Sequence, residues 1–145
     1  MKQAIREAER AFEIEEVPVG AVIVYEGKII GKGHNQIFKL NDPTAHAEMI
    51  ALTSAANYLN SSRLDKCTIY VTLEPCAMCA GALVSAKVNT LFFGAFDPKA
   101  GACGTLFNIT QSATLNHQVK TIEGVLEDEC KFLLQSFFEK RRLVN

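Results

Sequence analysis

The chain has 145 residues, of which 48% are hydrophobic and 21% charged, and its formal net charge is -1 with a pI near 6.3. This length and composition predict one globular domain over residues 1–145. A core of that size folds without help from a metal ion or a disulfide, so a metal site in this chain would serve function. The near-neutral charge excludes a globally basic nucleic-acid binder but does not exclude a local basic patch.

The sequence shows no signal for export or membrane insertion. Residues 1–10 alternate charged and small side chains and lack the apolar stretch of a secretory signal. No apolar run approaches the roughly 20 residues that span a bilayer. The five cysteines fit thiols or metal ligands in a reducing compartment better than a disulfide framework, because their number is odd. We therefore expect a cytoplasmic protein with no membrane contact.

Hydrophobic periodicity and turn residues predict alternating helices and strands. Apolar residues at helical spacing mark the helices, and β-branched runs mark the strands, with a hairpin turn at Glu26-Gly27. In chain order we expect a helix over 1–16, strands over 19–24 and 28–32, a loop over 35–43, a helix over 45–58, a strand over 67–73, a helix over 76–86, a strand over 88–94, a loop over 97–104, a strand over 119–122 and a helix over 127–142. This order predicts an α/β domain in which helices cover both faces of one mixed five-stranded sheet.

Two short segments at predicted helix starts concentrate the reactive residue types. Cys76 and Cys79 stand at positions i and i+3 of a first helical turn, where their sulfurs share one face and the helix N-terminus favours thiolates. This pair alone fits a metal site and a redox pair equally well. His46 adds a nitrogen ligand, and one nitrogen with two thiolates suits Zn²⁺. Together these residues predict a site for one Zn²⁺ per chain.

Glu48 gives this predicted site a catalytic interpretation. A site with three protein ligands keeps its fourth position for water, which is typical of catalytic zinc. Glu48 follows His46 by two residues and is placed to move protons as the general acid/base. Taken singly, His46 would be a hydrogen-bonded helix-start histidine and Glu48 a surface carboxylate. The combination of His-x-Glu with Pro-Cys-x-x-Cys outweighs those interpretations, because it is the signature of zinc nucleobase deaminases.

Further blocks of sequence resemble one family within that class, the bacterial tRNA-specific adenosine deaminases. These blocks cover nearly the whole chain and comprise residues 17–22, 42–48, 73–82, 94–101 and 115–117, with Asn35 and the pairs Phe137-Phe138 and Arg141-Arg142. The resemblance implies a three-layer α/β/α fold similar to that of cytidine deaminase, and a homodimer. It also implies a hydrolytic conversion of adenosine to inosine at the wobble position of a tRNA anticodon.

The same resemblance implies a set of substrate contacts. Asn35 would lie against the flipped base and its sugar, and the backbone of Ala47 would face the base edge. Asp97 and Lys99 fall on a loop that touches anticodon nucleotides in that family. In ordinary structural terms, Asn35 ends a strand and Asp97 starts a turn. For Asn35 the functional interpretation is preferred, and for Lys99 both remain open.

The C-terminal helix offers a second candidate RNA surface. Phe138 would stack on a base, and Arg141 and Arg142 would neutralise phosphates of a tRNA anticodon stem-loop. The alternative is that Phe137 and Phe138 are both core residues and that the charged run is a solvated helix face. The net charge of -1 argues against extensive RNA contact.

Two other functions compete with this hypothesis. A guanine deaminase shares both motifs and acts on a free base, whereas a non-catalytic zinc module would need a fourth protein ligand and no Glu48. A cytidine deaminase is disfavoured because its first ligand is usually cysteine where this chain has His46. His34 and His117 are the candidates for a fourth ligand, although neither has a ligand-like spacing. Cys103 is assigned no role.

Overall fold

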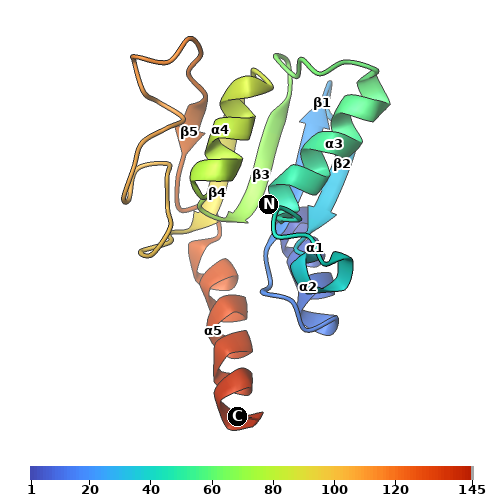
Figure 1. Cartoon of the computed structure of the whole chain (residues 1–145), viewed down its shortest axis with the longest axis vertical. Coiled ribbons are helices and arrows are strands. Elements are labelled where there is room, and N and C mark those ends of the chain that lie inside the picture. Colours follow the sequence, from blue (N-terminus) through green and yellow to red (C-terminus); the bar gives the residue numbers. More distant parts are fainter. Residues whose placement is uncertain (145) are drawn as a thin grey trace.

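Five strands form one mixed sheet in the order β2-β1-β3-β4-β5 (Figure 1). The strands are β1 (Gly20–Tyr25), β2 (Lys28–His34), β3 (Thr68–Leu73), β4 (Thr90–Ala95) and β5 (Lys120–Ile122). β1 pairs antiparallel with β2 and β3, whereas β3, β4 and β5 run parallel to one another. The structure is a computed structural model that describes residues 1–144, so the predicted domain end at residue 145 lies outside the described residues.

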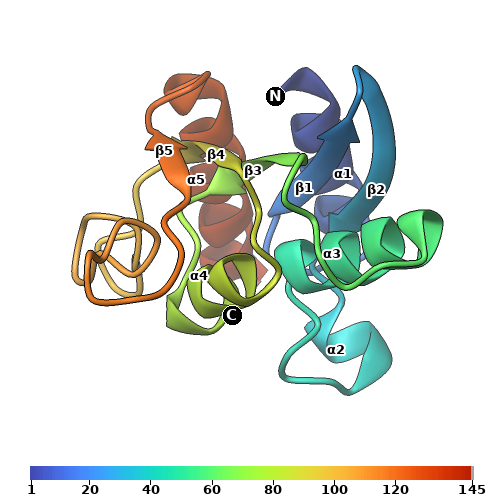
Figure 2. The same cartoon turned by 90° about the horizontal axis from the view of Figure 1, so that it is seen from above.

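Helices cover both faces of this sheet. α3 (Ala47–Leu59) and α4 (Ala77–Ser85) lie on one face, and α1 (Lys2–Glu13) and α5 (Glu127–Val144) lie on the other (Figure 2). This arrangement confirms the predicted three-layer α/β/α fold. The C-terminal part of α5 extends beyond the end of the sheet at which β3 and β4 finish (Figure 1). Across residues 1–144, no helix combines the length and the apolar character that a bilayer crossing requires.

One short helix was not predicted. α2 (Ile37–Leu40) occupies part of the expected loop over residues 35–43. The buried carboxylate of Glu16 accepts hydrogen bonds from the backbone N–H groups of Phe38 and Lys39 at 3.0–3.1 Å. These bonds satisfy donors that a single helical turn leaves without partners, so a distant residue stabilises the turn. The other helices and strands lie within a few residues of their predicted bounds.

Glycines in β2 allow α3 to pack unusually close to the sheet. A Cβ atom at Gly31 would lie 2.5 Å from the carbonyl oxygen of Ala51, and one at Gly33 would lie 2.3 Å from that of Ala47. Ala47, Ala51 and Ala55 are fully buried on the facing side of α3. Small residues on both surfaces therefore set the distance of α3 from the sheet.

Replacing Gly31 by alanine should push α3 away from β2. We expect Gly31→Ala to lower the free energy of unfolding by about 1–3 kcal/mol, the usual cost of overpacking a core, as measured by urea denaturation. Gly81→Ala in α4 is the matched control, because its new Cβ meets no atom within 4 Å and helix propensity favours alanine. Equal stability of Gly31→Ala and the wild type would contradict the packing argument.

Candidate active site

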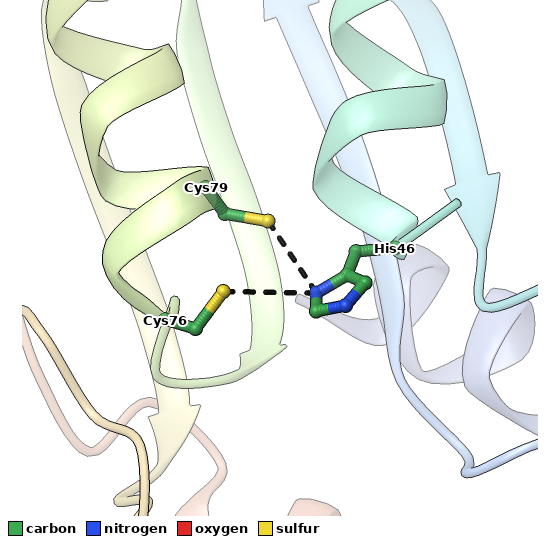
Figure 3. A group of neighbouring side chains, drawn as sticks. All are labelled: His46, Cys76 and Cys79. Atoms are coloured by element: carbon green, nitrogen blue, oxygen red, sulfur yellow. Dashed lines mark hydrogen bonds between the residues drawn. The ribbon is translucent and has the colours of Figure 1, made fainter. Parts of the chain in front are cut away.

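His46, Cys76 and Cys79 converge on one point although 30 residues separate the first two (Figure 3). The His46 Nδ1 atom lies 3.7 Å from Cys76 Sγ and 3.6 Å from Cys79 Sγ. The candidate ligand atoms of all three residues lie within 4.8 Å of one another. The structure thus brings the three predicted metal ligands together.

The starts of two helices create this convergence. His46 is the N-cap of α3, and Cys76 is the N-cap of α4, both with extended backbone dihedrals. Cys79 lies in the first turn of α4, on the side that faces His46 (Figure 3). Two helix N-termini therefore direct their positive ends toward the same cluster, where they favour negatively charged sulfur.

The two thiols of the cluster compete for one negative charge. The Cys79 thiol next to Cys76 lowers the pKa of Cys76 to about 3, and His46 contributes to this shift to a smaller degree. The neighbouring Cys76, together with burial, raises the pKa of the Cys79 thiol. The hydrogen bond between Cys76 and His46 raises the pKa of His46. A divalent cation would remove the competition, because both sulfurs would then face positive charge.

Glu48 is buried beside the cluster. It lies in the first turn of α3, is 4% exposed, and interacts with the Cys79 thiol. Burial is the largest influence on the Glu48 carboxyl and raises its pKa to about 7. The interpretation of Glu48 as a surface carboxylate is therefore excluded.

Asn35 and Ala47 meet at the same helix start. The Ala47 N–H donates a hydrogen bond of 2.9 Å to Asn35 Oδ1, and both residues are buried. Asn35 thereby satisfies one of the first N–H groups of α3 and fixes the helix beside β2. The base contacts expected of these two residues stay predictions.

Asp97 and Lys99 lie in the loop that follows β4. Asp97 Oδ1 accepts hydrogen bonds from the N–H groups of Lys99 and Ala100 at 3.0 and 3.1 Å, so the turn interpretation of Asp97 is right. The Lys99 side chain is exposed. Because β3 and β4 are parallel, this loop opens at the same edge as the turn that leads to Cys76.

The C-terminal helix uses some of its expected RNA-binding residues within the protein. Phe137 is 5% exposed and belongs to the core, whereas Phe138 is 45% exposed. The Arg141 guanidinium donates a 2.8 Å hydrogen bond to the carbonyl oxygen of Glu15 and lies 4.9 Å from the centre of the Phe137 ring. Arg142 is exposed. Arg141 therefore ties α5 to the end of α1, and RNA contacts of this helix stay a prediction.

The histidines considered as a fourth ligand lie outside the cluster. His34 pairs with Glu7 at 3.2 Å, and the His117 ring contacts the carbonyl oxygen of Val88 at 2.7 Å. Sequence reasoning gave no role to Glu74, which the structure buries next to the turn leading to Cys76. The sequence feature that could have pointed to Glu74 is its position, since it is an acidic residue at the end of a buried strand, directly before Pro75.

The sequence and the fold are both similar to those of known deaminases. Residues 1–142 match the family of MafB19-like deaminases. The chain belongs to this deaminase family. A tRNA-specific adenosine deaminase of Aquifex aeolicus is 52% identical over 142 residues, covering 98% of this chain and 93% of that protein. A solved structure from studies of A-to-I editing by tRNA deaminases at the wobble position has a TM-score of 0.89 and 40% identity, covering 92% of this chain and 97% of that one.

The family predicted from the sequence motifs is thereby confirmed, and the chain is a hydrolytic deaminase. A guanine deaminase from Nitrosomonas europaea has a TM-score of 0.78 with this deaminase but only 21% identity, covering 94% of this chain and 81% of that one. At that identity the likeness shows a shared fold alone.

The two neighbouring arginines of α5 should differ in their effect on stability. Arg141→Ala should lower the free energy of unfolding by roughly 0.5–1 kcal/mol, because it removes a hydrogen bond and a cation–π contact at an exposed site. Arg142→Ala should leave stability unchanged and is the matched control. Urea denaturation of the two variants checks this difference, and equal midpoints would show that the Arg141 contacts add nothing.

Proposed function

We propose that this protein converts adenosine to inosine at the wobble position of a tRNA anticodon. The convergence of His46, Cys76 and Cys79 beside the buried carboxyl of Glu48 carries the proposal. The similarity to tRNA-specific adenosine deaminases over nearly the whole chain supports the choice of adenosine in tRNA as substrate. We further propose that residues 1–145 act as one deaminase domain.

The cluster fits one zinc ion per chain. His46 offers an imidazole nitrogen and the two cysteines offer sulfur, which is a donor set that suits Zn²⁺, and the three atoms are close enough to share one ion. When bound, the ion lowers the pKa of a water molecule and makes it a nucleophile near neutral pH.

Glu48 performs the proton transfers of the reaction. Its carboxyl is buried next to the candidate ligands, which supports its role as the group that exchanges protons with the attacking water and with the purine. Glu48 takes a proton from water as oxygen bonds to the carbon bearing the amine, and delivers a proton to the adjacent ring nitrogen. It then takes the remaining proton from the new hydroxyl group and passes it to the amine, so that a carbonyl forms as the carbon–nitrogen bond breaks and ammonia leaves.

Asn35 and Ala47 orient the base. The Asn35 side chain is held at the start of α3 by its hydrogen bond to the Ala47 N–H, within one residue of His46. In this position Asn35 lies against the base and its sugar, and the backbone of Ala47 faces the base edge. Both residues are buried, so a base that reaches them has left the stack of the anticodon loop.

Residues of the loop after β4 and of α5, at the same edge of the sheet, bind the anticodon stem-loop. Asp97 and Lys99 contact nucleotides from the loop after β4. Phe138 stacks on a base, while Arg142 and the remaining N–H groups of Arg141 meet phosphates. The extension of α5 beyond the end of the sheet supports this assignment, because it places the helix at the edge where β3 leads into the Cys76 turn (Figure 1).

We also propose that the protein acts as a homodimer in the cytoplasm. Phe38 and Leu40 of α2 are 66% and 52% exposed, and large exposed apolar side chains fit a surface that a second copy covers. The odd number of cysteines, all of them free thiols in the structure, supports a reducing compartment.

The function is tested by incubating the zinc-loaded protein with two substrates in separate reactions. We expect inosine from an anticodon stem-loop with adenosine at the wobble position, and no xanthine from free guanine. Glu48→Ala should keep its zinc and lose turnover by about 10⁴-fold or more, because it removes the proton-transfer group and leaves the ligands. Xanthine alone would establish a guanine deaminase, and absence of both products would favour a non-catalytic zinc protein.

The metal assignment has its own test. Cys79→Ser should lose bound zinc, because it replaces a thiolate with a hydroxyl that binds zinc poorly. Cys67→Ser is the matched control. Cys67 is also buried, but it lies directly before the start of β3, whereas the candidate ligands Cys76 and Cys79 follow the end of that strand. Metal analysis should find one zinc per chain in the wild type and in Cys67→Ser. A full zinc complement in Cys79→Ser would remove Cys79 from the ligand set.

A further inference from the structure

Glu74, to which the sequence analysis gave no role, has its carboxylate buried among the backbone N–H groups of the loop over residues 97–105. Glu74 directly follows β3, precedes Cys76 by two residues and is only 2% exposed. Its two oxygens accept hydrogen bonds from the N–H groups of Asp97, Cys103 and Thr105 at 3.1, 3.0 and 3.1 Å, and from the Thr105 hydroxyl at 2.5 Å. One side chain thus gathers both ends of the loop over residues 97–105.

The loop is shaped to fit this carboxylate. A Cβ atom at Gly101 would lie 2.4 Å from Glu74 Oε1, so only glycine allows the loop to pass so close. On the adjoining residue, the carbonyl oxygen of Pro75 accepts a hydrogen bond of 2.9 Å from the Ala102 N–H. The loop therefore packs against both residues of the turn that leads to the candidate ligand Cys76.

No basic side chain pairs with Glu74 in any ion pair found within residues 1–144. Its partners are peptide N–H groups and a hydroxyl, all of them donors. Hydrogen bonds to a buried carboxylate are strong. Each of these donors also needs an acceptor within the protein, because water is excluded and cannot replace it. Glutamine has the same shape but would turn an NH₂ group toward some of these donors.

We propose that Glu74 is a positioning residue that fixes the 97–105 loop against the Cys76 turn and thereby sets substrate binding through Asp97 and Lys99. Asp97 receives this constraint directly, because its own N–H is bound to Glu74. Lys99 receives it through Asp97 Oδ1, which accepts the Lys99 N–H. The role in substrate binding rests on the proposed function, whereas the role in holding the loop does not.

Amide hydrogen exchange tests the loop-holding role without any substrate. Glu74→Gln should speed exchange at Asp97, Cys103 and Thr105. Glu16→Gln is the matched control, since Glu16 is a similarly buried carboxylate that accepts the N–H groups of Phe38 and Lys39, which lie outside the 97–105 loop. That control should speed exchange at those two amides and leave the 97–105 loop unchanged. Unchanged loop exchange in Glu74→Gln would overturn the proposal.

Steady-state kinetics on the anticodon stem-loop test the role in binding. Glu74→Gln should raise KM by roughly 10- to 100-fold through misplaced contacts, while kcat stays within a few-fold and zinc stays at one per chain. Gly101→Ala should shift KM in the same direction, because its Cβ displaces the loop from the same carboxylate. If Glu74→Gln does not fold, Thr105→Val removes the hydroxyl that donates to Glu74 and keeps the Thr105 N–H donor, and it should raise both KM and loop exchange.

Two further results would overturn the proposal. Loss of zinc and of kcat with an unchanged KM would assign Glu74 to the Cys76 turn alone, and an unchanged KM with faster loop exchange would separate the loop from substrate binding. A wild-type protein without turnover on the stem-loop contradicts the proposed function before any variant is compared. The exchange measurement then decides the loop-holding role by itself.

Discussion

The site depends on one geometric constraint: two helices must begin at the same point beside the carboxyl end of β3. α3 reaches that point because Gly31 and Gly33 let its backbone touch the sheet. α4 begins there because β3 ends at Leu73 and Pro75 cannot continue the strand ladder. Each helix then contributes its N-cap residue to the cluster, so the spacing of the ligands follows from backbone packing.

Charge at the site follows from that convergence. Two helix N-termini favour thiolates, yet only one of the two sulfurs becomes strongly acidic, because the second is buried next to the first. Burial also raises the pKa of Glu48 to about 7. The protein therefore gathers more anionic side chains than it can ionise together. A dication suits such a site better than a disulfide or an unligated thiol pair does.

Much of this could be predicted from sequence, because the decisive patterns are local. The spacing of Cys76 and Cys79 and the alternation of helices and strands are visible within a few residues. The missed features depend on distant partners. α2 exists because Glu16 accepts its N–H groups, and Arg141 contacts Glu15 across 126 positions of the chain. Neighbouring helix positions point in different directions, so the packing of α5 on α1 decides which aromatic residue of the pair at 137 and 138 is buried.

Two buried carboxylates hold the short helix α2 and the loop after β4 in place, where no sheet or long helix does so. Glu16 fixes the start of α2, just before the stretch that leads into α3, and Glu74 fixes the loop after β4. Both carboxylates are buried and accept backbone N–H groups, and side chains of the segments they hold, such as Phe38 and Lys99, are exposed. Under the proposed function, the loop after β4 presents Lys99 to the anticodon stem-loop, and α2 presents Phe38 to a second copy of the chain. Internal carboxylates provide that fixity without covering the surface.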